Sequence, residues 1–212
     1  MIEWIFFDMG STLINETESY KSWFSNASKQ INGAISAIEI EKEYCAGMKI
    51  GKPTVSGQLN AYGFIGNDTS HLYPSELDKP YPEAAKVLEQ LSHKYKLGII
   101  ANQKVGSESR LTQYGLRQFF DIIVASFEAG VKKPDPRIFK MALAQAQCLP
   151  ENAVMTGDRL DNDIYPAKKL GMSTIWIRQG WGGMAEPISE EYEPDYSVNS
   201  LTEILNVLEE LA

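Results

Sequence analysis

The chain alternates short runs of apolar residues with longer stretches in which apolar residues recur with a helical period. Short runs of this kind are typical of buried strands, and the periodic stretches are typical of amphipathic helices. Apolar runs predict strands at residues 2–7, 96–101, 122–125, 153–156 and 174–177. Periodic stretches predict helices at residues 84–95, 108–114, 136–147, 161–170 and 201–211. Strands that alternate with helices in this way indicate an α/β fold with a parallel sheet covered on both faces.

One region does not follow this alternation. Residues 16–65 are mostly helical in pattern, and residues 66–80 are rich in the turn formers Gly, Asn, Asp and Pro. We therefore expect residues 15–80 to form a small helical cap inserted after the first strand. Residues 1–14 and 81–212 would then form the core.

Composition limits the classes of partner. The net charge of -8 and the pI near 4.9 argue against nucleic-acid binding, which requires a basic face. The two cysteines, Cys45 and Cys148, have no metal-ligand spacing and predict free thiols in a reducing compartment. No signal peptide and no apolar run long enough to cross a bilayer is found in the sequence, so we expect a cytoplasmic protein without a membrane partner. Nothing in the sequence predicts its oligomeric state.

Candidate chemistry lies in the segments that follow the strands, because ligands of open α/β sheets bind beyond the carboxyl ends of the strands. Asp8 directly follows the first apolar run, and Asp158 and Asp163 follow the fourth. Carboxylates gathered at one edge need a cation, and hard oxygen ligands of this kind suit Mg²⁺. Asp161 is a further acid in this segment, but its position favours a helix N-cap.

Other polar groups belong to the same edge. Lys133 adds a positive charge, and the Gly10-Ser11-Thr12 turn offers backbone N–H groups and hydroxyls to an anion. Carboxylates, a metal, a lysine and hydrogen-bond donors around one point predict a site that handles a phosphoryl group.

These residues carry a resemblance to a known family. Asp8 after its strand, Lys133 in the Lys-Pro-Asp-Pro motif and Gly157-Asp158 followed by Asp163 resemble the haloacid dehalogenase-like hydrolase superfamily with a small helical cap. The resemblance implies a five-stranded, Rossmann-like three-layer core. It implies Asp8 as a nucleophile that forms an aspartyl-phosphate and Lys133 as the residue that steadies Asp8 and the phosphate. It also implies Mg²⁺ bound by Asp8, the backbone carbonyl of Gly10, Asp158 and Asp163.

The sequence departs from the family pattern in two places. Gly10 stands where phosphatases of the superfamily carry a second aspartate, the general acid and base, whose proton transfer is typically worth about 10²–10⁴-fold in rate. Ala101 replaces the usual phosphate-binding Thr or Ser, so the amides of Asn102 and Gln103 are candidate substitute donors. Arg159, beside Asp158, would contact either the substrate or a neighbouring acid.

Three functions are compatible with these departures. The first is a Mg²⁺-dependent hydrolase of a small phosphorylated metabolite, in which water, substrate or a cap residue replaces the missing acid. Without a proton donor it would favour good leaving groups, such as aryl and acyl phosphates. The second is a 2-haloacid dehalogenase, since halide leaves without a proton, although residues 15–80 contain no arginine to bind it. The third is a phosphate-ligand-binding or regulatory protein with little or no turnover. We favour the first.

Overall fold

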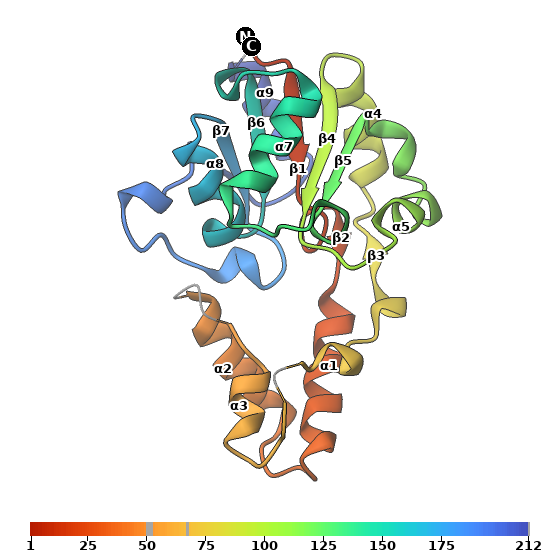
Figure 1. The fold of residues 1–212 in the computed structure, drawn as a ribbon, viewed down its shortest axis with the longest axis vertical. Helices are drawn as coiled ribbons and strands as arrows, with labels where there is room; N and C mark the ends of the chain where they lie inside the picture. Colours follow the sequence, from red (N-terminus) through yellow and green to blue (C-terminus); the bar gives the residue numbers. More distant parts are fainter. Residues whose placement is uncertain (50–52, 67, 212) are drawn as a thin grey trace.

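The computed structural model describes residues 1–49, 53–66 and 68–211, and its main feature is a six-stranded parallel sheet (Figure 1). The strand order is β5-β4-β1-β6-β7-β8. The strands are β1 (Trp4–Phe7), β4 (Lys96–Ala101), β5 (Ile122–Ala125), β6 (Ala153–Gly157), β7 (Ser173–Ile177) and β8 (Tyr196–Val198). Each neighbouring pair is parallel. The predicted α/β fold is therefore confirmed, with β8 as a strand that the sequence pattern did not predict.

Helices cover both faces of this sheet. They are α4 (Ala84–Ser92), α5 (Ser107–Gln113), α6 (Ser126–Ala129), α7 (Pro136–Ala146), α8 (Tyr165–Lys169) and α9 (Glu203–Leu211). Successive side chains of a strand point to opposite faces. Accordingly, Phe7 of β1 packs in one apolar cluster with Leu88 of α4 and Leu208 of α9, whereas Phe6 packs in another with Phe139 of α7. The core therefore has the three layers of a Rossmann-like fold.

A group of helices lies between the first strand and α4 along the chain. It contains α1 (Thr17–Gln30), α2 (Ala37–Lys49) and α3 (Ser56–Asn60), followed by the short turns Ser70–Leu72 and Ser75–Leu77. Phe24, Ile40 and Leu59 from the three helices belong to one apolar cluster, which also includes Trp181 of the core. Figure 1 shows these helices beyond the carboxyl edge of the sheet. The expected helical region includes residues 50–52, which lie outside the described residues.

The insertion joins the core through two short strands. β2 (Ile14–Asn15) pairs antiparallel with β3 (Lys79–Pro80), so the chain leaves and re-enters the core side by side. The assignment of residues 15–80 to a separate cap domain stays our proposal, and these strands lie at its two boundaries.

The segment after β6 differs from the helix predicted at residues 161–170. A π-helical turn, Leu160–Ile164, comes first, and α8 begins only at Tyr165. Pro166 lies in the first turn of α8, where its missing N–H is tolerated. The wide turn brings Asp163 into the buried interior, where only 1% of its surface is exposed.

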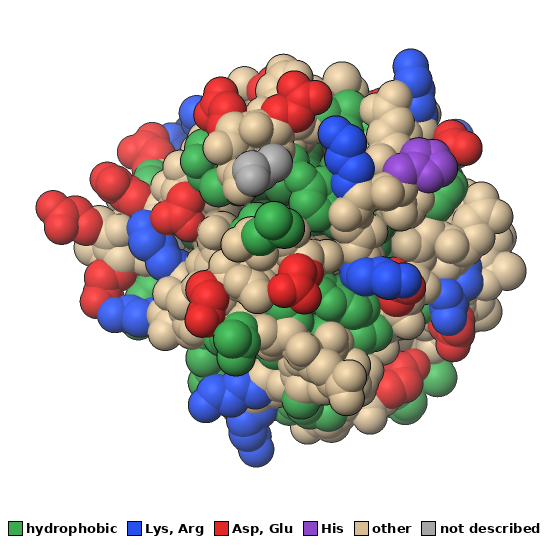
Figure 2. All heavy atoms as spheres, turned by 90° about the horizontal axis from the view of Figure 1, so that it is seen from above, with side chains coloured by type: hydrophobic (Ala, Val, Ile, Leu, Met, Phe, Trp, Pro, Cys, Tyr) green, Lys and Arg blue, Asp and Glu red, His purple; other side chains and the backbone are tan. Residues whose placement is uncertain are grey.

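The surface at the end of the molecule remote from the insertion is mixed in charge. Figure 2 shows acidic side chains lying between the basic ones over this face. Such interspersed charge differs from the basic face that phosphate neutralisation requires. Within the part of the chain that the structure describes, no helix is both long and apolar enough to cross a membrane.

Candidate active site

A small cavity lies at the carboxyl edge of the sheet, between the core and the helical insertion. Its volume is about 220 Å³. The sequence-predicted residues that line it are Asp8, Gly10, Ser11, Asn102, Gln103, Lys133, Asp158, Arg159 and Asp163. The other lining residues are Glu16, Tyr20, Met48, Asn162, Trp181 and Gly182. The fold thus brings together the sequence-predicted residues from four separate loops.

Lys133 is the centre of the buried charges in this cavity. Its Nζ donates hydrogen bonds to Asp8 Oδ1 at 2.6 Å, to Asp163 Oδ1 at 2.5 Å and to the carbonyl oxygen of Ile100 at 2.8 Å. Only 3% of Lys133 is exposed. Burial alone would lower the lysine pKa, but the charges and hydrogen bonds of Asp163 and Asp8 outweigh it and leave the pKa raised. Lys133 is therefore held as a cation between two carboxylates.

Three carboxylates form an oxygen cluster suited to a metal ion. One oxygen each from Asp8, Asp158 and Asp163 lies within 4.8 Å of the others, and all three residues are buried. Burial, followed by the neighbouring acids Asp163 and Asp8, raises the pKa of Asp158 well above its ordinary value. Burial also raises the pKa of Asp163, to about 6, although Lys133 acts in the opposite direction.

The Asp158 carboxylate gives a direct test of whether a cation fits. Among the described residues it accepts no hydrogen bond, whereas the oxygens of Asp163 accept bonds from Lys133 and from the backbone N–H of Arg159. A buried carboxylate without donors is costly unless a cation compensates it. Three convergent hard oxygens are also the ligand type that Mg²⁺ prefers. The residues present therefore fit a divalent cation.

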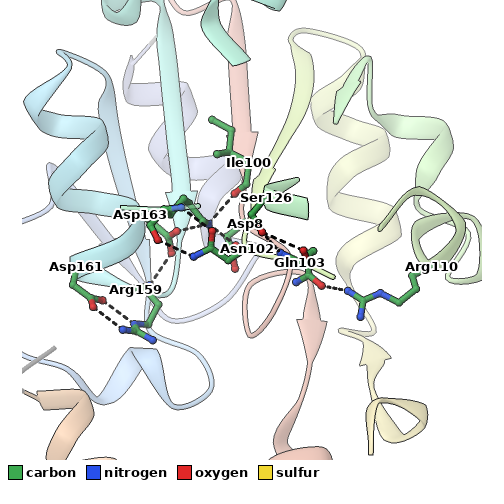
Figure 3. Close-up of polar contacts among 10 residues, drawn as sticks. Asp8, Ile100, Asn102, Gln103, Arg110, Ser126, Arg159, Asp161 and Asp163 are labelled. Carbon is green, nitrogen blue, oxygen red and sulfur yellow. Dashed lines mark hydrogen bonds and ion pairs between the residues drawn. The ribbon is translucent and has the colours of Figure 1, made fainter. Parts of the chain in front are cut away.

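Asp161 is not part of this cluster, and the expectation that it caps a helix is wrong. It lies inside the π-helical turn, and its oxygens accept from Arg159 Nε at 2.8 Å and Nη2 at 2.6 Å (Figure 3). This two-point ion pair orients the Arg159 guanidinium at the cavity. Arg159 thus pairs with a neighbouring acid and also lines the cavity.

The amide of Asn102 is occupied by the backbone of Lys133. Asn102 Oδ1 accepts from Lys133 N at 2.7 Å, and Nδ2 donates to Lys133 O at 2.9 Å. Gln103 Oε1 accepts from Arg110 at the other side of the edge (Figure 3). Asn102 therefore holds the loop that carries Lys133, a task that its position in the sequence did not indicate.

The Gly10-Ser11-Thr12 turn contributes unequally to the cavity. Ser11 lines it, whereas Thr12 is fully buried and is not among the lining residues. The Thr12 hydroxyl has no hydrogen-bond partner within the described residues. Of this turn, Gly10 and Ser11 line the cavity and Thr12 does not.

A glycine-rich loop closes the cavity beside the carboxylates. Gly182 packs so tightly that an added Cβ would overlap Asp158 Oδ2. The neighbouring Trp181 is 7% exposed and packs on Tyr20 and Phe24 of α1. This loop from the core is therefore in contact with both the acid cluster and the helical insertion.

Glu16 is one of the lining residues that sequence reasoning did not predict. It is the residue before α1, and its carboxyl group occupies the space beside Gly10, where an added Cβ would lie 2.7 Å from Oε2 and 2.8 Å from Oε1. Glu16 retains some exposed surface, but protein atoms enclose its carboxyl group. This burial, followed by the charges of Asp78 and Asp8, raises its pKa to about 8. In the sequence, Glu16 is one of two acids beside Thr17, and no motif distinguishes it.

Comparison with known proteins agrees with this architecture. The family model described as haloacid dehalogenase-like hydrolase matches residues 5–177. A glyceraldehyde 3-phosphate phosphatase of Methanocaldococcus jannaschii is 30% identical over 100% of this chain and 99% of its own length. One of Methanopyrus kandleri is 40% identical, but the match spans 63% of this chain and 58% of that protein. The HAD-hydrolase YfnB of Bacillus subtilis, solved bound to magnesium, shares the fold with a TM-score of 0.72, 21% identity and 98% coverage of each chain.

Proposed function

Because this chain belongs to the haloacid dehalogenase-like hydrolase family, we propose that it is a Mg²⁺-dependent phosphatase of a small phosphorylated metabolite. The observation that carries the proposal is the buried Lys133, which bridges Asp8 and Asp163 beside a third carboxylate, Asp158. A nucleophile, a fixed cation and a cluster of metal-binding oxygens at one point suit phosphoryl transfer.

The size of the site supports a small substrate. The cavity of about 220 Å³ is smaller than the roughly 300–1,000 Å³ typical of sites for drug-sized ligands. The relatives from Methanocaldococcus jannaschii and Methanopyrus kandleri are named for the hydrolysis of a three-carbon sugar phosphate. We therefore place the substrate among short phosphate esters, with residues 15–80 acting as the cap that selects it.

We assign the reaction to Asp8. Lys133 occupies Oδ1 of this carboxylate, which leaves Oδ2 to attack phosphorus and form an aspartyl-phosphate that water then hydrolyses. Bound Mg²⁺, held by Asp8, the Gly10 carbonyl, Asp158 and Asp163, would neutralise charge on the phosphoryl oxygens.

The remaining polar groups would bind the phosphate. We assign this role to the Gly10-Ser11-Thr12 turn and to the side chains of Gln103 and Arg159. Asn102 would act through Lys133, whose backbone it holds. Apart from Thr12, which does not line it, these groups lie around one small cavity.

The experiment that tests the proposal measures phosphate release with and without Mg²⁺ for aryl, acyl, sugar and nucleotide phosphates. We expect turnover that requires Mg²⁺ and that falls by at least about 10³-fold in Asp8→Asn, because covalent catalysis loses its nucleophile. Asp121→Asn, an exposed aspartate paired with Lys96 away from the cavity, is the matched control.

The same experiment separates the two other functions. Release of halide from a 2-haloacid without metal would replace the phosphatase by a dehalogenase. Tight Mg²⁺-dependent binding of beryllium fluoride without turnover of any phosphate would replace it by a ligand-binding protein.

A further inference from the structure

The space beside Gly10 is filled by the carboxyl group of Glu16. We propose that Glu16 is the general acid and base of the reaction at Asp8, taking the place of the side chain that Gly10 lacks. This inference rests on the proposed phosphatase function and adds a catalytic residue to it.

The first argument is that the two positions are complementary. An aspartate at position 10 would start where the Glu16 carboxyl group now lies, since its Cβ would be within 2.9 Å of Glu16 Cδ and of both carboxyl oxygens. Real Cβ atoms essentially never approach other atoms so closely. With a side chain at residue 10 the Glu16 carboxyl group would have to shift, so glycine leaves this position open to it. The carboxyl group thus belongs to residue 16 instead of residue 10, but it lies beside the backbone of residue 10.

The second argument is that Glu16 faces the reacting groups. It lines the cavity together with Asp8 and Lys133. Ser11 has a left-handed backbone conformation, with φ of 54°, and its hydroxyl donates to Glu16 Oε2 at 3.1 Å. Oε1 accepts no hydrogen bond from any described residue. One oxygen is thus anchored, and the other is free to exchange a proton with a ligand.

The third argument is that the charged donors of the site are unsuited to this role. The three ammonium hydrogens of Lys133 are already directed to Asp8, Asp163 and Ile100. The guanidinium of Arg159 does not release a proton in proteins. Asp163 accepts from both Lys133 and the backbone of Arg159. The other acids that line the cavity, Asp8, Asp158 and Asp163, form the cluster of candidate metal-binding oxygens. Glu16 is not part of this cluster, and its carboxyl group lies beside Gly10.

The proposed cycle balances as follows. Asp8 Oδ2 forms a bond to phosphorus while the bond from phosphorus to the leaving oxygen breaks, and the Glu16 carboxyl proton passes to that oxygen to give an alcohol. The Glu16 carboxylate then takes a proton from water as the water oxygen attacks the aspartyl-phosphate. The water oxygen bonds to phosphorus and the bond between phosphorus and Asp8 breaks, which releases phosphate and restores the Asp8 carboxylate and the protonated Glu16.

This assignment changes the expectation drawn from Gly10. Without a proton donor, turnover would depend steeply on the basicity of the leaving group, and alkyl phosphates would react poorly. With Glu16 as the donor, alkyl phosphates such as glyceraldehyde 3-phosphate are substrates, and the dependence is shallow.

The first test compares an aryl phosphate with an alkyl phosphate in Glu16→Gln. Because proton transfer is typically worth about 10²–10⁴-fold, we expect turnover of glycerol phosphate or glyceraldehyde 3-phosphate to fall by that factor. Formation of the phosphoenzyme from p-nitrophenyl phosphate should fall much less, because p-nitrophenolate leaves without a proton. Glu18→Gln, an exposed glutamate in the first turn of the same helix, is the control and should match the unmodified protein on both substrates.

A second readout separates a catalytic role from a structural one. In Glu16→Gln the aspartyl-phosphate formed from p-nitrophenyl phosphate should accumulate, because the base that activates water is gone, and intact-protein mass would detect it. Moving the carboxyl group back, in Gly10→Asp with Glu16→Ala, should recover alkyl-phosphate turnover relative to Glu16→Ala alone.

The outcomes distinguish this inference from the proposed function. If the unmodified protein hydrolyses phosphates and Asp8→Asn does not, the phosphatase stands. If Glu16→Gln then keeps full alkyl-phosphate turnover without phosphoenzyme accumulation, the role of Glu16 is overturned. If the unmodified protein and the relocated variant both lack turnover of every phosphate, the phosphatase proposal itself is overturned.

Discussion

At the scale of single residues, the site depends on how four buried charges compensate one another. Lys133 neutralises part of the charge of Asp8 and Asp163. Under the proposed function, a metal ion would compensate Asp158. Such an arrangement is stable only while every charge keeps a partner, because an uncompensated buried ion is costly. The neighbouring Lys132 has the same side chain but is exposed, whereas Lys133 is buried.

Replacement of Lys133 tests this balance. In Lys133→Met we expect phosphate turnover to be lost and the free energy of unfolding to fall by about 3–5 kcal/mol, because two buried carboxylates lose their cation. Lys132→Met should change the free energy of unfolding by less than about 0.5 kcal/mol. Urea unfolding of both variants measures the difference. An equal loss in the two variants would contradict the assigned bridge.

Residues of the site differed in how far the sequence revealed them. Asp8 and Asp158 follow apolar strands directly, so the topology of a parallel sheet predicts that they meet at one edge. Glu16 has no such marker, because its place at the cavity depends on how the insertion folds back over Gly10. The sequence left open whether Arg159 contacts the substrate or a neighbouring acid, and in the structure it pairs with Asp161 of the π-helical turn.

At the scale of elements, apolar runs in the sequence predicted the central strands, but short or polar strands were not predicted. β4 and β5 have the predicted bounds, because each is a continuous apolar run within a buried sheet. β8 is only three residues long and contains Tyr196 and Ser197, so its pattern does not differ from a loop. The β2–β3 pair was not predicted either, because each strand has only two residues and their pairing joins residues 14–15 with residues 79–80, far apart in the sequence.

The loop between β7 and β8 gives a prediction at this scale. In Gly182→Ala the added Cβ would overlap Asp158 Oδ2, so the loop or the carboxylate must shift. We expect the Mg²⁺ concentration at half-maximal activity to rise by about tenfold, a change of about 1.4 kcal/mol in binding free energy. Gly57→Ala in α3, where the nearest atoms belong to the Thr54 side chain, is the control. An unchanged Mg²⁺ dependence in Gly182→Ala would show that the loop does not confine Asp158.

At the scale of the whole molecule, the acid cluster couples stability to pH and metal. Without metal, Asp163 keeps a proton up to a pKa of about 6, whereas in the unfolded chain its ordinary value is 3.8. The folded protein then binds more protons than the unfolded chain in this window, so its stability falls as the pH rises through it. The raised pKa values of Asp158 and Glu16 act in the same direction.

Mg²⁺ should therefore stabilise the protein more at alkaline than at acidic pH, because it competes with protons for the same oxygens. Near pH 8, Mg²⁺ at a concentration of about 100 times its dissociation constant should raise the free energy of unfolding by about 2.7 kcal/mol. At the same concentration near pH 5, we expect an increase of less than about 1 kcal/mol. Thermal unfolding at both pH values, with Mg²⁺ and with a chelator, measures this difference.

Two aspartates of the same segment provide the control for this measurement. Asp158→Asn should abolish the stabilisation by Mg²⁺, and Asp161→Asn should retain it, because Asp161 pairs with Arg159 outside the cluster. Stabilisation that is equal at both pH values, or that survives in Asp158→Asn, would place the ion elsewhere.

The β2–β3 joint has a consequence for the order of events in a catalytic cycle. Asp8 precedes this joint on the core side, and Glu16 follows it directly at the start of α1. A rotation of the insertion about the joint would therefore separate the proposed nucleophile from the proposed proton donor. Under the assignment made above, only the closed molecule has a complete set of reacting groups. The joint would then couple the two events, so that the reacting groups come together only when the insertion closes over a bound ligand.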